Sequence, residues 1–138
     1  MGAEVNAQDD TTATALLQAA LQGHTDCVKV LLERGADTEI PLKAGMTPLM
    51  AAADGGGTAE TVHLLLDKGA KPNATDNDGS TALMYAAYRG KADIVRLLLE
   101  HGADINVKDK GGATALTAAK KGGHVDVIAL LQQAGAEE

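Results

Sequence analysis

The 138-residue sequence predicts an all-α repeat fold, in which helix-turn-helix units stack into a solenoid and are joined by β-hairpin-like loops. A Gly-Ala pair recurs with its glycine at positions 2, 35, 69, 102 and 135, and a Thr-x-Leu triplet recurs in phase at positions 14, 47, 81 and 114. This interval of 33 or 34 residues is typical of arrays of short helical units. Composition agrees, because a chain with two Tyr, no Phe and no Trp must fill its core with small side chains in closely packed helices.

The first helix of each unit is expected to begin after the recurring Thr, whose hydroxyl can accept a hydrogen bond from the first turn. Pro48 fits the first helical position, where its missing N–H is not needed. Leu and an Ala-Ala pair, such as Ala86-Ala87, then form a face of small residues. Glycine ends these helices, at Gly23, Gly56 or Gly57, Gly90 and Gly123.

The second helix of each unit carries apolar residues at i, i+3 and i+4 spacing, as at Ile94, Val95 and Leu98. The same spacing places Cys27 on the apolar face of the first unit, so its thiol is expected to be buried and inert. The recurring glycine at 35, 69, 102 and 135 should end this helix in the left-handed conformation. Asp, Asn and Gly then mark an exposed turn before the next Thr.

The segment DNDGSTALMYAAYRGKADIVRLLLEHGADIN (76–106) resembles an ankyrin repeat, with the Gly-x-Thr-x-Leu, Ala-Ala and Leu-Leu-Leu-x-x-Gly-Ala-Asp-x-Asn signatures of that family. The resemblance extends over essentially the whole chain. We therefore expect a single domain, 1–138, with repeats at approximately 9–41, 42–75, 76–108 and 109–138. Residues 2–8 resemble the tail of a preceding repeat, which predicts a segment of a longer array, although residues 15–23 also suit an N-terminal cap.

Two units depart from the pattern. The second contains one extra residue, which we place in the turn Asp54–Thr58, with both helices remaining in phase with their neighbours. The fourth has Lys120 and Gln132 where other units have apolar residues, as a terminal capping repeat would.

Several function classes are disfavoured. A net charge of −7 opposes sequence-independent nucleic-acid binding, and no apolar run is long enough to predict a membrane span. The glycine run at 55–57 lacks the lysine of a phosphate-binding loop, and the histidines lack i, i+4 metal-ligand spacing. We therefore expect no catalytic residues, no cofactor and no metal. A lone cysteine fits a reducing compartment, so an intracellular, cytoplasmic monomer is expected.

The resemblance implies a non-catalytic protein-interaction module that binds a peptide or folded partner on a concave face of loop tips and first helices. Candidate partner-binding residues are those in that region which the repeat pattern does not dictate: Lys43, Met46, Asn77, Asp78, Ser80, Tyr88, Arg89, Lys108, Lys110 and Lys121.

Two features of this set bear on the partner. The basic members, at 89, 108, 110 and 121, favour an acidic partner. Met50, Met84 and Tyr85 either join the binding face or pack between first helices. The alternative function is an excised, engineered or reconstructed repeat segment with a purely structural role and no partner of its own.

Overall fold

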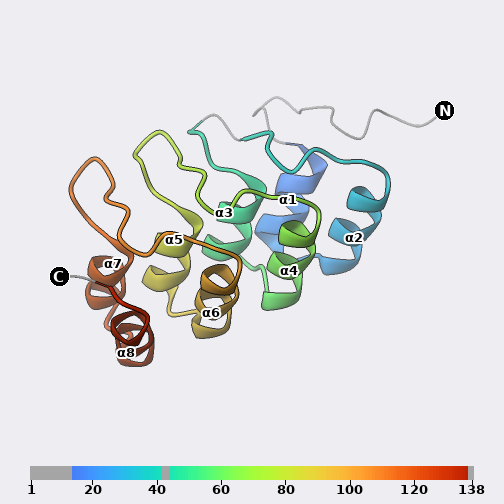
Figure 1. Cartoon of the computed structure of the whole chain (residues 1–138). Helices are drawn as coiled ribbons and strands as arrows, with labels where there is room; N and C mark the ends of the chain where they lie inside the picture. Colours follow the sequence, from blue (N-terminus) through green and yellow to red (C-terminus); the bar gives the residue numbers. More distant parts are fainter. Residues whose placement is uncertain (1–13, 42–43, 137–138) are drawn as a thin grey trace.

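The computed structural model describes residues 14–41 and 44–136, and these form eight α-helices with no β-strand among them. The helices are α1 (Ala15–Gln22), α2 (Thr25–Glu33), α3 (Pro48–Asp54), α4 (Ala59–Asp67), α5 (Ala82–Arg89), α6 (Ala92–Glu100), α7 (Ala115–Gly122) and α8 (Val125–Gln133). Each first helix packs on the second helix of its own unit, and Figure 1 shows α1, α3, α5 and α7 in one layer and α2, α4, α6 and α8 in the other. The predicted all-α repeat fold is confirmed. None of the helices in the described ranges is long and apolar enough to cross a bilayer.

The first helices begin as the sequence predicts. At Thr14, Thr47, Thr81 and Thr114 the threonine hydroxyl accepts a hydrogen bond from the backbone N–H three residues later, at 3.2 or 3.3 Å. Three of these helices end at a glycine in the left-handed conformation, Gly23, Gly90 or Gly123. The exception is α3, where the following Gly55 has φ −97°.

The extra residue of the second unit lies in the turn between α3 and α4, where it was predicted. Gly56 donates its N–H to the Leu21 carbonyl at 2.6 Å, so this turn runs against the end of α1. A Cβ at Gly55 would lie 2.3 Å from the same carbonyl oxygen, which explains why glycine is needed there. α4 stays in phase with its neighbours, because Val62 and Leu65 are fully buried like Val95 and Leu98 in α6.

The prediction for Cys27 is wrong, because its side chain is exposed. The equivalent residues of the other units, Thr61, Ile94 and Val127, are at most 1% exposed because each faces the preceding unit. No described unit lies on the corresponding side of α2, and this is the physical reason for the difference.

Met50 and Met84 both pack in the core, where they are 1% and 6% exposed, and Met84 also borders the concave side of the first helices. Two predictions fall outside the described residues, namely the repeat tail at 2–8 and the candidate Lys43.

Candidate functional site

The loops before α5 and α7 are each organised by one aspartate. An oxygen of Asp76 accepts hydrogen bonds from the backbone N–H groups of Asp78 and Ser80, both at 2.9 Å. Asp109 accepts the equivalent two bonds in the next loop, from residues 111 and 113. The two tips are joined, since the N–H of Lys110 donates to the carbonyl of Asp78 at 2.9 Å. Hydrogen bonds within and between these two loops therefore fix the backbone that carries the candidate residues.

A hollow of about 410 Å³ opens between α5, α7 and these loops. It is lined by Asp54, Ser80, Met84, Tyr85, Tyr88, Arg89, Asp109, Ala113, Thr114, Thr117, Ala118 and Lys121. Four candidates from two adjacent units, Ser80, Tyr88, Arg89 and Lys121, therefore meet at one concave feature. Its lining contains neither histidine nor cysteine.

The other candidates do not line this hollow. Asn77, Asp78, Lys108 and Lys110 are exposed on the neighbouring loops. Met46 is half-buried and packs against the core. The structure therefore separates the candidates into a group that lines the hollow, an exposed group on the adjacent loops, and Met46, which packs against the core.

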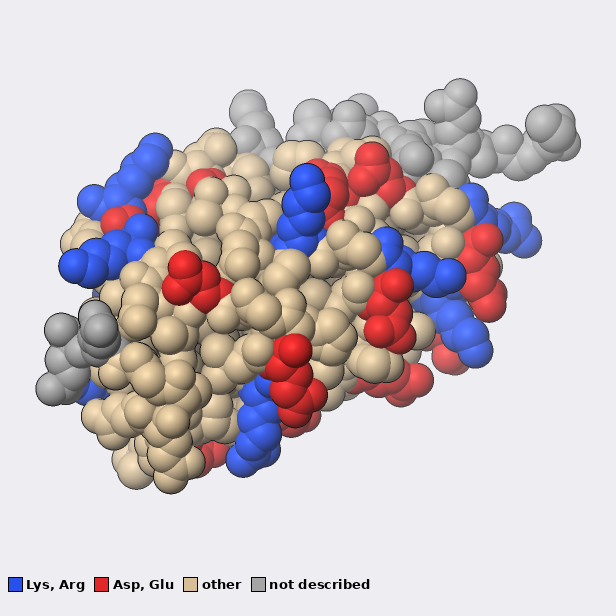
Figure 2. All heavy atoms as spheres, in the orientation of Figure 1, with Lys and Arg blue, Asp and Glu red and all other residues tan. Residues whose placement is uncertain are grey.

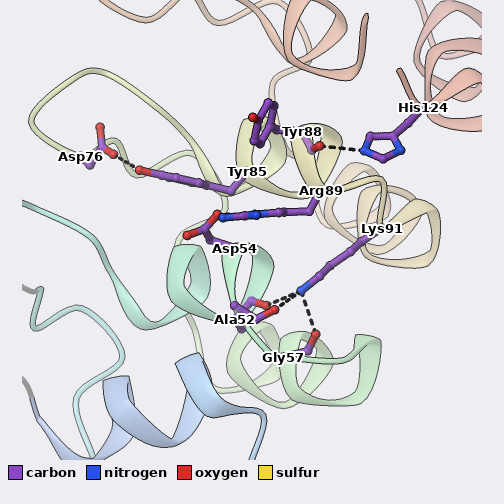
Figure 3. A network of polar contacts seen from close by, with 10 residues as sticks. Ala52, Asp54, Gly57, Asp76, Tyr85, Tyr88, Arg89, Lys91 and His124 are labelled. Atoms are coloured by element: carbon purple, nitrogen blue, oxygen red, sulfur yellow. Dashed lines mark hydrogen bonds and ion pairs between the residues drawn. The ribbon is translucent and has the colours of Figure 1, made fainter. Parts of the chain in front are cut away.

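Arg89, at the end of α5, contacts both its neighbour Tyr88 and Asp54, which lies at the end of α3 (Figure 3). The Arg89 Nε donates to the Asp54 carboxylate at 2.9 Å, and the guanidinium carbon lies 5.7 Å from the Tyr88 ring centroid. The hydrogen bond with Asp54, with the charge of that carboxylate, raises the pKa of Arg89. The positive charge of Arg89 is therefore already balanced within the protein.

Tyr85 has a positioning role. Its hydroxyl donates to Asp76 at 2.5 Å, which connects α5 to the loop that Asp76 organises (Figure 3). Burial, followed by the hydrogen bond and negative charge of Asp76, raises the pKa of Tyr85. Tyr85 therefore remains a neutral donor and supports the wall of the hollow.

Two further side chains fix the ends of first helices, and neither is among the binding residues predicted from the sequence. The Nζ of Lys91 donates to the carbonyls of Ala52, Gly55 and Gly57 in the preceding unit. The Nε2 of His124 donates to the Tyr88 carbonyl at 2.9 Å (Figure 3). Both residues directly precede a second helix, and this shared position is the signal that could have identified them.

Charged side chains are dispersed over the face of the molecule that Figure 2 draws. On the face drawn in Figure 2, basic and acidic side chains are intermixed between uncharged areas, and neither sign forms a continuous field. On this face, electrostatic recognition must therefore be local.

Comparison with known proteins agrees with the repeat architecture. A family model described as ankyrin repeats (3 copies) matches residues 1–76 and 56–138. The human "Ankyrin repeat and KH domain-containing protein 1" is 49% identical over 79 residues, which are 56% of this chain and 3% of that protein. The human "Ankyrin repeat domain-containing protein 63" is 38% identical over 92 residues, 64% of this chain and 24% of that protein. The Drosophila melanogaster "Neurogenic locus Notch protein" is 39% identical over 87 residues, 62% of this chain and 3% of that protein. The chain therefore spans a small part of the length of these relatives.

Proposed function

Because the chain belongs to the ankyrin repeat family, whose repeats are in general protein–protein interaction modules, we propose that it binds a peptide segment or loop of a protein partner in the hollow between α5 and α7. The observation that carries the proposal is the meeting of Ser80, Tyr88, Arg89 and Lys121 from two units at one concave feature. The module acts without catalysis, as a monomer inside the cell.

The hollow suits an apolar side chain of the partner. Met84 and Ala118 contribute apolar surface to it, and Tyr88 is 44% exposed beside them. A tyrosine ring offers a large contact area for little loss of conformational entropy, and Tyr is enriched among interface residues that dominate affinity. Contact with Arg89 also restrains the ring before a partner arrives.

An acidic residue of the partner would lie toward the rim. Since Asp54 balances Arg89, the basic groups that remain are those of Lys121 in the hollow and Lys110 and Lys108 on the loop, for which the described residues show no ion pair. Exposed charges of this kind mainly raise the association rate. Because the net charge is −7, attraction of an acidic partner must come from these lysines.

Selection from a displayed library of random peptides tests the proposal. Enriched peptides are expected to carry an apolar residue close to Asp or Glu. For the best peptide, Tyr88→Ala should raise the dissociation rate about tenfold, since an interface anchor of this type contributes more than 1 kcal/mol. Lys110→Glu should mainly slow association and flatten its salt dependence.

Arg96→Glu is the matched control, because Arg96 is exposed on α6 in the other helix layer. It should leave both rates within about twofold, as expected for a charge remote from the interface. Peptides that bind the Tyr88 and Lys110 variants as tightly as the parent would place recognition elsewhere, around Met46. A selection that enriches nothing would favour the alternative, a structural segment without a partner.

A further inference from the structure

Two histidines and an aspartate lie close together on the layer formed by α2, α4, α6 and α8. His63 and Asp67 are one turn apart on α4, and the His63 Nε2 lies 3.1 Å from the Asp67 Oδ2. His101, the residue after α6, faces them from the next unit, with its ring centroid 6.2 Å from that of His63. Potential ligand atoms of the three residues all lie within 4.8 Å of one another. Figure 1 shows α4 and α6 as neighbours in this layer.

These separations are close to those of a metal site. Nitrogen and oxygen ligands at 2.0–2.2 Å from a tetrahedral ion are roughly 3.3–3.6 Å apart. The pair His63–Asp67 already stands near this distance, at 3.1 Å. His101 must approach the pair by an ångström or so, and all three residues are exposed and able to rotate.

The hydrogen-bonding state of His101 suits a ligand. Its Nδ1 donates to the Leu97 carbonyl at 3.0 Å, which leaves the Nε2 lone pair free in the neutral ring. Histidines that bind metals usually donate their second ring nitrogen to a carbonyl or carboxylate in this way. Without metal, the Nε2 of His63 carries the proton that it donates to Asp67. For Nε2 to bind a metal, this proton must move to Nδ1, and the ion then takes the place of the hydrogen bond between the two side chains.

The neighbouring units show that the fold does not require these histidines. The positions equivalent to 63, 67 and 101 carry Lys29, Glu33 and Lys68 between the first two units. Between the last two units they carry Arg96, Glu100 and Ala134. Only the α4–α6 contact combines two imidazoles with a carboxylate among the described residues.

We propose that His63, Asp67 and His101 bind a divalent transition-metal ion, with Zn²⁺ as the probe ion, in a three-ligand site completed by water. Imidazole ligands favour Zn²⁺, Cu²⁺ or Ni²⁺ over Mg²⁺ and Ca²⁺, which prefer all-oxygen sites. The negative charge of Asp67 and the net charge of −7 both favour a bound cation.

The experiment is calorimetric titration of the full chain with Zn²⁺, with ¹⁵N spectra of the imidazole rings. Cys27→Ser is introduced in every sample, because the exposed thiol of Cys27 would itself bind zinc. We expect one Zn²⁺ per chain, with shifted ring nitrogens at His63 and His101 and unchanged ones at His124. Mg²⁺ and Ca²⁺ at equal concentration should not compete.

Matched variants come from the chain itself. His63→Lys and His101→Lys reproduce the residues of the neighbouring unit contact, so both should fold, which circular dichroism verifies. Each should weaken Zn²⁺ binding about tenfold or more, because each removes one of three ligands. His24→Gln removes an imidazole on α2's side of the stack and should change affinity less than about twofold. Zinc affinity that is unchanged in the double variant His63→Lys/His101→Lys, or the absence of saturable binding to the parent, would overturn the proposal.

Discussion

Replacing Lys91 with Met tests whether contacts between units hold the irregular second unit in place. The Lys91 Nζ donates to the Gly55 carbonyl at 2.5 Å and to those of Ala52 and Gly57 at 3.3 Å (Figure 3). These carbonyls lie at the end of α3 and in the following turn, where the helix dipole is negative and the last carbonyls lack helical partners. Met retains the length of the apolar stem and removes only the cation.

The magnitude follows from this geometry. The two bonds at 3.3 Å are at the long limit for an N–H donor, so one charge-assisted bond, to Gly55, dominates. Such a bond contributes roughly 1.5–3 kcal/mol. Burial acts in the opposite direction, since desolvation lowers the pKa of Lys91 despite the nearby charge of Asp54. We therefore expect Lys91→Met to reduce the free energy of unfolding by about 1–2 kcal/mol.

Urea denaturation followed by circular dichroism measures this loss. Lys29→Met, at an exposed site on α2, is the control and should stay within about 0.5 kcal/mol of the parent. A Lys91→Met variant equally close to the parent would refute the reasoning.

A second check is the pH dependence of the difference in unfolding free energy between the parent and Lys91→Met. The folded pKa of Lys91 lies below its ordinary value of 10.5, so between the two values the unfolded chain binds more protons than the folded one. The stability contributed by Lys91 must then rise with pH in that window, and the gap between parent and variant should widen as pH approaches 10.5. A constant gap would show that burial of the charge is not responsible.

Three further predictions concern the third unit. Leu98 is fully buried, so Leu98→Ala should destabilise the protein by about 2–5 kcal/mol in urea melts, and a loss below about 0.5 kcal/mol would mean that the register is wrong. Thr81→Ala removes the hydroxyl that caps α5 and should lose about 0.5–2 kcal/mol, measured in the same way, whereas Thr81→Ser should retain most of the stability. In a Tyr88→Phe background, Tyr85 is the tyrosine that remains, and its phenolate absorbance should appear only well above pH 10.0, the ordinary pKa of tyrosine. Because the folded pKa is raised, the stability that Tyr85 contributes should be complete below pH 10 and lost as the pH rises through the folded pKa. Asp76→Asn should shift that titration toward 10.0, and an unchanged titration would assign the effect to burial alone.

The features that could be predicted from the sequence are those that recur locally in every unit. A threonine hydroxyl caps a helix within three residues, and a glycine ends it nearby, so the first helices follow from short stretches such as Thr81 to Gly90. The core follows from the period, because stacking buries equivalent residues such as Val62 and Val95 in one continuous core. The extra residue of the second unit was predictable because three successive glycines can absorb an insertion.

The features that could not be predicted depend on which side chain reaches across a unit boundary. Arg89 is one of the basic residues from which the sequence predicts an acidic partner, but its charge is paired with Asp54 at the end of the preceding first helix. Cys27 has the spacing of a buried residue, but its side chain is exposed because no described unit packs against that side of α2. His63 and His101 lack metal-ligand spacing within one helix, and they meet only because stacking brings adjacent units together. Such pairs are about one period apart in the sequence, where local patterns carry no signal about side-chain reach.

The residues just before α6 and α8 donate hydrogen bonds to the end of the first helix in the preceding unit, and the type of each matches the way that helix ends. At the end of α5, where the helix closes with a left-handed glycine, the ring of His124 satisfies one carbonyl, that of Tyr88. α3 ends without such a glycine and continues into a longer turn, and the last turn of α3 together with this turn directs three carbonyls toward the following unit. An imidazole has one N–H to donate in its neutral form, whereas the ammonium group of Lys91 has three on a flexible stem. The insertion in the second unit and the lysine at the start of α6 are therefore one structural feature, shared by two repeats that the sequence pattern treats as separate.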